Sequence, residues 1–178
     1  MWKRLRIARS ATLLGIAIIC TLSAGLAVAA SINIVALGAS NTNGRGVGRA
    51  LAWPAQLEDM LRAKGYAAHV TNEGIDGDTT RGMLSRLNSA VPDGTQIVIL
   101  DKTPSTDRDK GVTDSAANIS AIVGQLRARG VKSIIIASNW SWGGFRLQPD
   151  HQHLTAEGHS LLAARLLPMV IASLGKAR

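Results

Sequence analysis

Residues 34–44, Ile34-Val-Ala-Leu-Gly38-Ala-Ser40-Asn-Thr-Asn-Gly44, join an apolar run to a loop of small polar residues. The apolar run predicts a buried β-strand over residues 32–37, followed by a tight turn. A serine just past a buried strand lies at the carboxyl edge of a parallel sheet, where α/β proteins carry their functional groups. If a short helical turn begins at Ser40, the hydroxyl and the backbone N–H of Ser40 both point toward this edge of the sheet.

The same alternation continues along the chain and decides the fold class. Short β-branched runs recur over residues 67–71, 96–100 and 131–137. Segments with helical period lie between them: from Trp53-Pro54 to Gly65, after Asp78 as N-cap, from about Asp114 to Arg129, and from Thr155 to about Leu174, interrupted or ended late by Pro168. Strands separated by such helices need crossover connections, so we expect a three-layer α/β sandwich with a parallel sheet of about four to five strands. Residues 31–178 show no repeat or linker and are expected to form one domain.

The first thirty residues have a different character. Four basic residues precede an apolar stretch from Ala11 to Leu22, and the small-residue run Ala27-Val28-Ala29 follows. This order is typical of a signal peptide cleaved after Ala29, or of an uncleaved N-terminal membrane anchor. The first interpretation predicts a periplasmic or secreted protein, and the second predicts an inner-membrane anchor with the domain facing outward.

Composition and charge exclude several other classes of protein. The 178 residues are 46% apolar with a net charge of +8, but Lys3, Arg4, Arg6 and Arg9 carry four of those charges. The weak remaining charge gives no reason to expect a nucleic-acid partner, and membrane contact is expected only through residues 1–30. Cys20, the one cysteine, lies in the apolar stretch, so no thiol nucleophile or Cys-based metal site is expected in the domain.

A carboxylate and an imidazole precede the last predicted helix. Asp150 and His153 are three residues apart, and on a turn this spacing lets the carboxylate reach the imidazole and fix its tautomer. A serine hydroxyl needs such a base. An alternative is a weak metal site made by Asp150, His151 and His153, although no further ligand cluster completes it. A nucleotide-binding loop is a weaker alternative, because the glycines that follow Ser40 do not have the spacing of a phosphate-binding motif.

Three blocks of residues together resemble the SGNH (GDSL-like) hydrolase superfamily, over essentially the whole chain after residue 30. They are Gly38-Ala39-Ser40, Asn72-Glu-Gly74-Ile-Asp-Gly77-Asp-Thr79-Thr80 and Asp150-x-x-His153. The resemblance implies a flavodoxin-like sheet and a small bacterial esterase or lysophospholipase that acts on a small-molecule ester or acyl substrate without metal or organic cofactor. It assigns Ser40 as nucleophile, His153 as general base and Asp150 as its partner. The N–H groups of Ser40 and Gly74 would form the oxyanion hole.

Two departures from the family pattern affect this interpretation. Ala39 replaces the aspartate of Gly-Asp-Ser, and the third block, Gly-x-Asn-Asp, is replaced by residues 100–108, Leu-Asp-Lys-Thr-Pro-Ser-Thr-Asp-Arg. Depending on the alignment, Thr106 or Ser105 takes the place of the asparagine that would donate to the oxyanion. A hydroxyl is a less preorganised donor than a held amide. The alternative function is therefore a catalytically impaired protein of this fold that binds an acyl or glycan ligand.

The remaining candidate residues are aromatic or basic. Trp140, Trp142 and Phe145 cluster before Asp150, either as a wall of an acyl or aryl pocket or as a cover for an open sheet edge. His69 and His159 are assigned to packing or to the surface. The other Lys and Arg residues are expected to be scattered, solvated charges.

Overall fold

The computed structural model describes residues 31–136 and 146–175. The expected signal peptide or anchor, residues 1–30, lies outside the described residues. The same holds for the expected aromatic pocket wall of Trp140, Trp142 and Phe145.

Four parallel strands form the sheet in the described part of the chain, in the order β2-β1-β3-β4. They are β1 (Ile32–Gly38), β2 (Ala68–Gly74), β3 (Ile97–Asp101) and β4 (Lys132–Ile136). The register pairs Gly38 with Gly74 and Leu37 with Leu100. The carboxyl ends of β2, β1 and β3 therefore meet at one edge, as the alternating pattern predicts.

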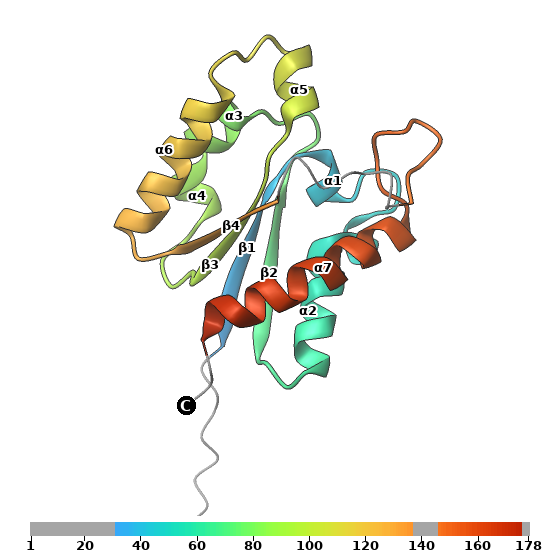
Figure 1. Ribbon diagram of the computed structural model, residues 1–178, viewed down its shortest axis with the longest axis vertical. Helices are drawn as coiled ribbons and strands as arrows, with labels where there is room; N and C mark the ends of the chain where they lie inside the picture. Colours follow the sequence, from blue (N-terminus) through green and yellow to red (C-terminus); the bar gives the residue numbers. More distant parts are fainter. Residues whose placement is uncertain (1–30, 137–145, 176–178) are drawn as a thin grey trace, which may run out of the picture.

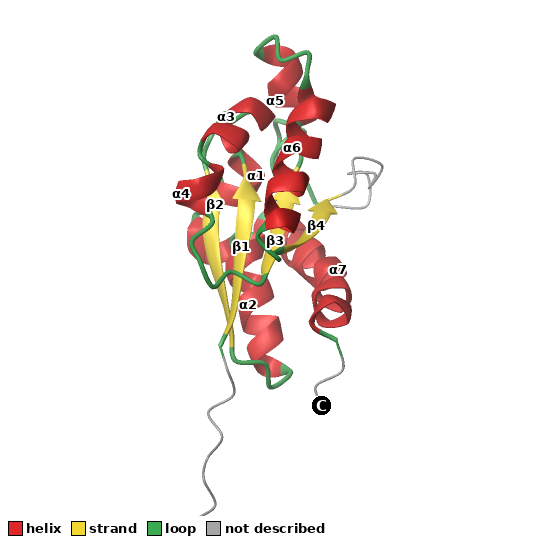
Figure 2. Ribbon diagram, turned by 90° about the vertical axis from the view of Figure 1, so that its left-hand side faces the viewer, coloured by secondary structure: helices red, strands yellow, loops and turns green. Residues whose placement is uncertain are grey.

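Helices cover both faces of this sheet, which confirms the predicted three-layer α/β sandwich (Figures 1 and 2). One face carries α2 (Trp53–Ala63) and α7 (Ala156–Leu174), and the other carries α3 (Thr80–Ser85), α4 (Leu87–Ala90) and α6 (Ser115–Ala128). The short helices α1 (Ser40–Asn43) and α5 (Pro104–Asp109) lie at the carboxyl edge, and η1 (Arg49–Leu51) leads into α2. None of the helices in the described ranges is both long and apolar enough to cross a membrane.

Two apolar layers form the core because alternate strand residues point to opposite faces. Ile34 of β1 and Ile99 of β3 pack in the layer of α2 and α7. Val35 and Leu100 pack in the layer of α3, α4 and α6. All four side chains are buried, so both central strands are fixed in register and hold the loops at their ends.

Two details of the helices differ from the sequence-based expectation. The N-cap of α3 is Thr79, whose hydroxyl accepts a hydrogen bond from the Gly82 N–H at 3.0 Å. Asp78, the expected cap, forms an ion pair elsewhere. Pro168 neither interrupts nor ends α7, because the buried side chains of Leu166 and Val170 hold the helix against the sheet on both sides of it.

Candidate active site

Ser40 begins α1 directly at the end of β1. The chain turns sharply there because Gly38 packs against Asp101 and Thr42: a Cβ on Gly38 would come within 2.8 Å of the Asp101 Cβ. Only glycine fits at this point. The turn leaves Ser40 at the carboxyl edge of the sheet, as its place in the sequence predicts.

The structure brings the three predicted side chains together in a hydrogen-bonded relay. Ser40 Oγ lies 2.9 Å from His153 Nε2, and His153 Nδ1 lies 2.6 Å from Asp150 Oδ2. The segment before α7 thus lies beside α1, although more than a hundred residues separate them in the chain (Figure 1). This is the geometry in which an imidazole can take the proton of a serine hydroxyl.

The carboxylate of Asp150 is held by its own loop. Its Oδ1 accepts hydrogen bonds from the backbone N–H groups of Gln152 and His153, each at 3.0 Å. The hydrogen bond from His153, with these two N–H groups, holds the pKa of Asp150 well below its usual range. An ionised Asp150 keeps the proton on His153 Nδ1, which leaves Nε2 free to accept the proton of Ser40.

Asn41 fixes the loop on both sides of His153. Its Nδ2 donates to the Gln152 carbonyl at 3.1 Å, and its Oδ1 accepts from the Leu154 N–H at 3.0 Å. A single amide therefore ties the helix that carries Ser40 to the loop that carries the base. The sequence analysis did not identify Asn41, because nothing in its spacing links it to a loop so distant in the chain.

A cavity of about 260 Å³ opens beside Ser40. Its lining is mostly polar: Ala39, Ser40, Asn41, Asp101, Lys102, Thr103, Pro104, Ser105, Thr106, Arg108, His151 and Gln152. A larger cavity of about 760 Å³ lies at the opposite edge of the sheet, near Ile32, Ile97 and Lys132. None of the predicted site residues lines it, so the smaller cavity is the candidate site.

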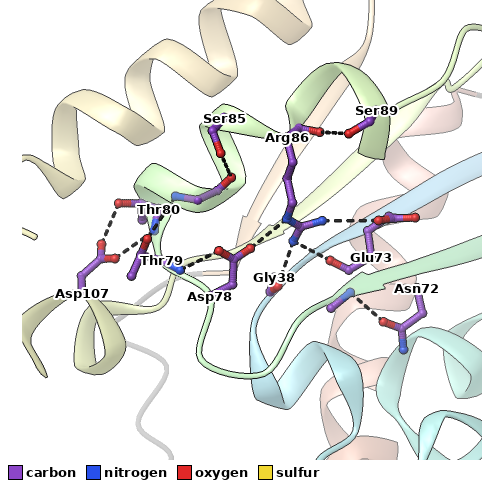
Figure 3. A network of polar contacts seen from close by, with 12 residues as sticks. Gly38, Asn72, Glu73, Asp78, Thr79, Thr80, Ser85, Arg86, Ser89 and Asp107 are labelled. Carbon is purple, nitrogen blue, oxygen red and sulfur yellow. Dashed lines mark hydrogen bonds and ion pairs between the residues drawn. The ribbon is translucent and has the colours of Figure 1, made fainter. Parts of the chain in front are cut away.

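The loop in place of the third block forms α5, a helix that the sequence analysis did not predict. Asp107 anchors it: the buried carboxylate accepts from the Thr80 N–H at 2.8 Å and from the Thr80 hydroxyl at 2.7 Å (Figure 3). Ser105 and Thr106 both line the cavity, with Thr106 the less exposed of the two. Both stay candidates for a donor at the oxyanion position.

The Gly74 N–H, an expected oxyanion donor, already has a hydrogen-bond partner in the structure. The Gly74 N–H donates to Asn72 Oδ1 at 2.9 Å, and Gly74 is not among the described residues that line the cavity. Packing explains why residue 74 is a glycine, because a Cβ at this position would lie within 2.6 Å of the Asn43 Cα. Gly74 therefore lets β2 approach α1.

Arg86 is a structural cation that the sequence analysis assigned to the solvated surface. Its guanidinium donates to Asp78 Oδ2 at 2.8 Å, to the Glu73 carbonyl at 2.8 Å and to the Gly38 carbonyl at 3.3 Å, and it pairs with the Glu73 carboxylate at 3.3 Å (Figure 3). Arg86 thus joins the ends of β1 and β2 to the loop before α3. The end of β1 leads directly into α1, which carries Ser40.

Asp101 is a further carboxyl group at the site that the sequence analysis missed. It ends β3 and is buried, and its Oδ2 accepts a hydrogen bond from the Thr42 hydroxyl at 3.0 Å. Burial raises the pKa of Asp101 to about 6, against the hydrogen bond from Thr42, which lowers it. An acidic residue directly after a predicted buried strand is the signal that could have identified it.

The other histidines have packing or surface roles, as expected. His159 is buried on α7, and its Nδ1 accepts from the Trp53 N–H at 3.2 Å, in the first turn of α2. Burial lowers the pKa of His159 to about 4. His69 is exposed and lies 3.1 Å from Glu58.

The metal alternative has no support in the described ranges, where no three His, Cys, Asp or Glu side chains lie close enough to hold an ion. Both ring nitrogens of His153 already have partners in Asp150 and Ser40. His151 lines the cavity, with its backbone in the left-handed region at φ 56°.

The fold is similar to that of solved esterases of the SGNH hydrolase type, in agreement with the fold that the three sequence blocks imply. A psychrotrophic esterase, EstA, from Pseudoalteromonas sp. superposes with a TM-score of 0.69 at 18% identity, over 81% of this chain and 99% of that one. AlinE4, an SGNH-hydrolase family esterase, superposes with a TM-score of 0.56 at 23% identity, over 83% of this chain and 98% of that one.

A sequence relative with a named activity is Esterase TesA of Pseudomonas aeruginosa. It is 25% identical over 125 residues, which are 69% of this chain and 59% of the esterase, so the chain matches less than two thirds of that protein's length. A comparison with protein-family models finds no match.

Proposed function

We propose that this chain is a serine hydrolase that cleaves carboxylic esters or thioesters of small molecules. The observation that carries the proposal is the unbroken relay from Ser40 Oγ through His153 to Asp150. The similar proteins named above are all esterases, and this supports the same reaction class. The intact relay also disfavours the alternative of a non-catalytic binder of acyl or glycan ligands.

The reaction would proceed through an acyl-enzyme. Ser40 Oγ forms a bond to the acyl carbon while its proton passes to His153 Nε2, and the carbonyl electrons move onto the oxygen. The Ser40 N–H, with Thr106 or Ser105, would stabilise this oxyanion. When the ester bond breaks, the leaving alcohol or thiol takes the proton from His153. Water then repeats the sequence, with His153 as base, and releases the acid and Ser40.

This reaction needs no metal or organic cofactor, because the relay supplies both the nucleophile and the proton transfers. The test is hydrolysis of an ester panel by the wild type, Ser40→Ala and His151→Ala. We expect Ser40→Ala to be inactive, and His151→Ala to stay active because the hydrogen bonds of the relay do not involve the His151 side chain. Full activity of Ser40→Ala would overturn the assignment.

We further propose that the protein is exported, with residues 1–30 as a signal peptide or as an inner-membrane anchor. The basic start, apolar stretch and Ala27-Val28-Ala29 support this. The mass of the chain from periplasmic, medium and membrane fractions tests it. A mature chain that begins at Ala30 supports cleavage, and an intact chain in the membrane fraction supports the anchor. Intact protein in the cytoplasm alone would contradict both.

A further inference from the structure

Asp101 lies next to α1, the short helix that begins at Ser40. Because β1 and β3 pair with Leu37 opposite Leu100, Gly38 and Asp101 come next in register, and the absent side chain of Gly38 lets Asp101 approach. The Asp101 carboxyl is hydrogen-bonded to Thr42 on α1, two residues beyond Ser40. Asp101 and Ser40 line the same cavity, although Asp101 is only 5% exposed.

Only one carboxyl oxygen of Asp101 is used by the fold. Oδ2 accepts from the Thr42 hydroxyl, whereas no donor in the described part of the chain reaches Oδ1. Four fully enclosed polar side-chain atoms in the described ranges lack a hydrogen-bond partner, and Asp101 Oδ1 is not one of them. This oxygen is therefore not sealed off from the cavity that Asp101 lines. A proton on this oxygen could be donated into that cavity.

The protonation state of this carboxyl matters for the proposed reaction. In the transition state negative charge develops on the substrate's carbonyl oxygen, and a carboxylate in the same small cavity would oppose it. A neutral carboxyl would instead donate a hydrogen bond to it. Such a donor would complete the oxyanion hole, because the asparagine of the family pattern is absent, the Gly74 N–H is used elsewhere, and the rotatable hydroxyls of Ser105 and Thr106 are less preorganised donors.

We propose that Asp101, in its neutral form, is a catalytic residue that donates a hydrogen bond to the oxyanion and takes the role of the missing asparagine. The proposal rests on the ester-hydrolase function proposed above. No proton is transferred in this step: the carboxyl keeps its hydrogen throughout. The raised pKa of Asp101, about 6, makes the neutral form accessible in mildly acidic solution.

The charged groups around Asp101 come from two sides of the cavity. Lys102 and Arg108 lie on the α5 side, and His151 and His153 come from the segment before α7. Neither α1 nor β1 contributes a charged side chain. Thr42, the hydrogen-bond partner of Asp101, is neutral, and burial is the main cause of the raised pKa of Asp101.

A pH dependence follows: the rate should fall with rising pH as Asp101 loses its proton. Loss of one oxyanion donor costs roughly 10² to 10³ in rate, and Asp101 is about half neutral at pH 6, so kcat/KM of the wild type should fall about twenty- to fiftyfold between about pH 6 and pH 8.

The decisive variant is Asp101→Asn, assayed with phenyl acetate. Its Oδ1 can still accept from Thr42, and its Nδ2 then faces the cavity as a donor at every pH. We expect the alkaline fall to disappear, so that above about pH 8 the variant is at least roughly tenfold faster than the wild type. Asp59→Asn, at an exposed carboxyl on α2, is the control and should keep the wild-type profile.

The proposal is overturned if the wild type shows no alkaline fall, or if Asp101→Asn keeps the same fall. If Asp101→Asn does not fold, Thr42→Val decides. It removes the hydrogen bond that lowers the Asp101 pKa, so the alkaline limb should move to higher pH, and an unmoved limb contradicts the role of Asp101. Labelling of Ser40 by a fluorophosphonate separates the two proposals: a labelled, active enzyme with an unchanged profile refutes only Asp101, whereas no labelling and no turnover refute the hydrolase.

Discussion

Replacement of Arg86 by methionine should destabilise the fold far more than a comparable change at the surface. The side chain is 16% exposed, and its main partner, the Asp78 carboxylate, is 10% exposed. The change removes the countercharge of Asp78 and leaves the Gly38 and Glu73 carbonyls without this donor. Methionine keeps much of the apolar stem, so the loss is mainly polar.

The magnitude follows from this burial. Removal of one partner of a buried ion pair costs about 3–5 kcal/mol, because the other charge stays buried. Arg86 and Asp78 retain some contact with water, so we expect a loss of about 3 kcal/mol in the free energy of unfolding. Arg81 is the matched control: its ion pair with Asp114 is of similar length, 3.0 Å against 2.8 Å, but the side chains are 62% and 46% exposed. Arg81→Met should cost under about 1 kcal/mol.

Urea unfolding of the two variants and the wild type measures both losses in the free energy of unfolding, and thermal unfolding gives a second readout. The melting temperature should fall by about 6–12 °C for Arg86→Met, at roughly 2–4 °C per kcal/mol for a domain of this size. Arg86→Lys keeps the positive charge but not the several N–H donors of the guanidinium, so it should be less destabilised than Arg86→Met but still less stable than the wild type. Equal, small losses for Arg86→Met and Arg81→Met would refute the structural role of Arg86.

Three further changes test the site. Asn41→Ala should lower kcat by about ten- to a hundredfold with little effect on KM, because the loop of His153 loses its two ties, whereas exposed Asn88→Ala should leave steady-state kinetics unchanged. Asp150→Asn should lower kcat by up to about 10⁴, since the wrong imidazole tautomer is favoured; a wild-type kcat would remove Asp150 from the mechanism. The raised pKa of Asp101 means that the folded protein is more stable with this carboxyl protonated. The wild type should therefore lose roughly 2 kcal/mol in the free energy of unfolding, relative to Asp101→Asn, as the pH rises from about 4 to 7. Urea unfolding at each pH measures this difference, and a constant difference would contradict the burial of this charge.

Local pattern was sufficient to predict most of the fold. The β-branched runs and helical periods lie where the four strands and the long helices α2, α6 and α7 occur, because each element buries an apolar face of its own period. The short helix α5 was missed: only six residues long, it is held by the contact of Asp107 with Thr80 rather than by an apolar face. Such a contact depends on the tertiary structure.

The site was predicted only where a motif of adjacent residues carries the chemistry. Ser40, Asp150 and His153 come together as their motifs predict. Arg86 and Asn41 could not be identified, because a side chain that reaches residues far away in the chain has the same sequence signature as one in solvent. Gly74 was assigned a role from its block, but its backbone approach to Asn43 explains the residue better.

The most direct test of the central claim is the site of covalent reaction with a fluorophosphonate probe, located by peptide mass spectrometry in the wild type and in His153→Ala. We predict a single modified peptide that carries the probe on Ser40, with labelling of His153→Ala slower by at least roughly a hundredfold, because the serine loses its base. The account would be contradicted by a probe on another residue, by no reaction of the folded protein, or by equal labelling rates for the two proteins.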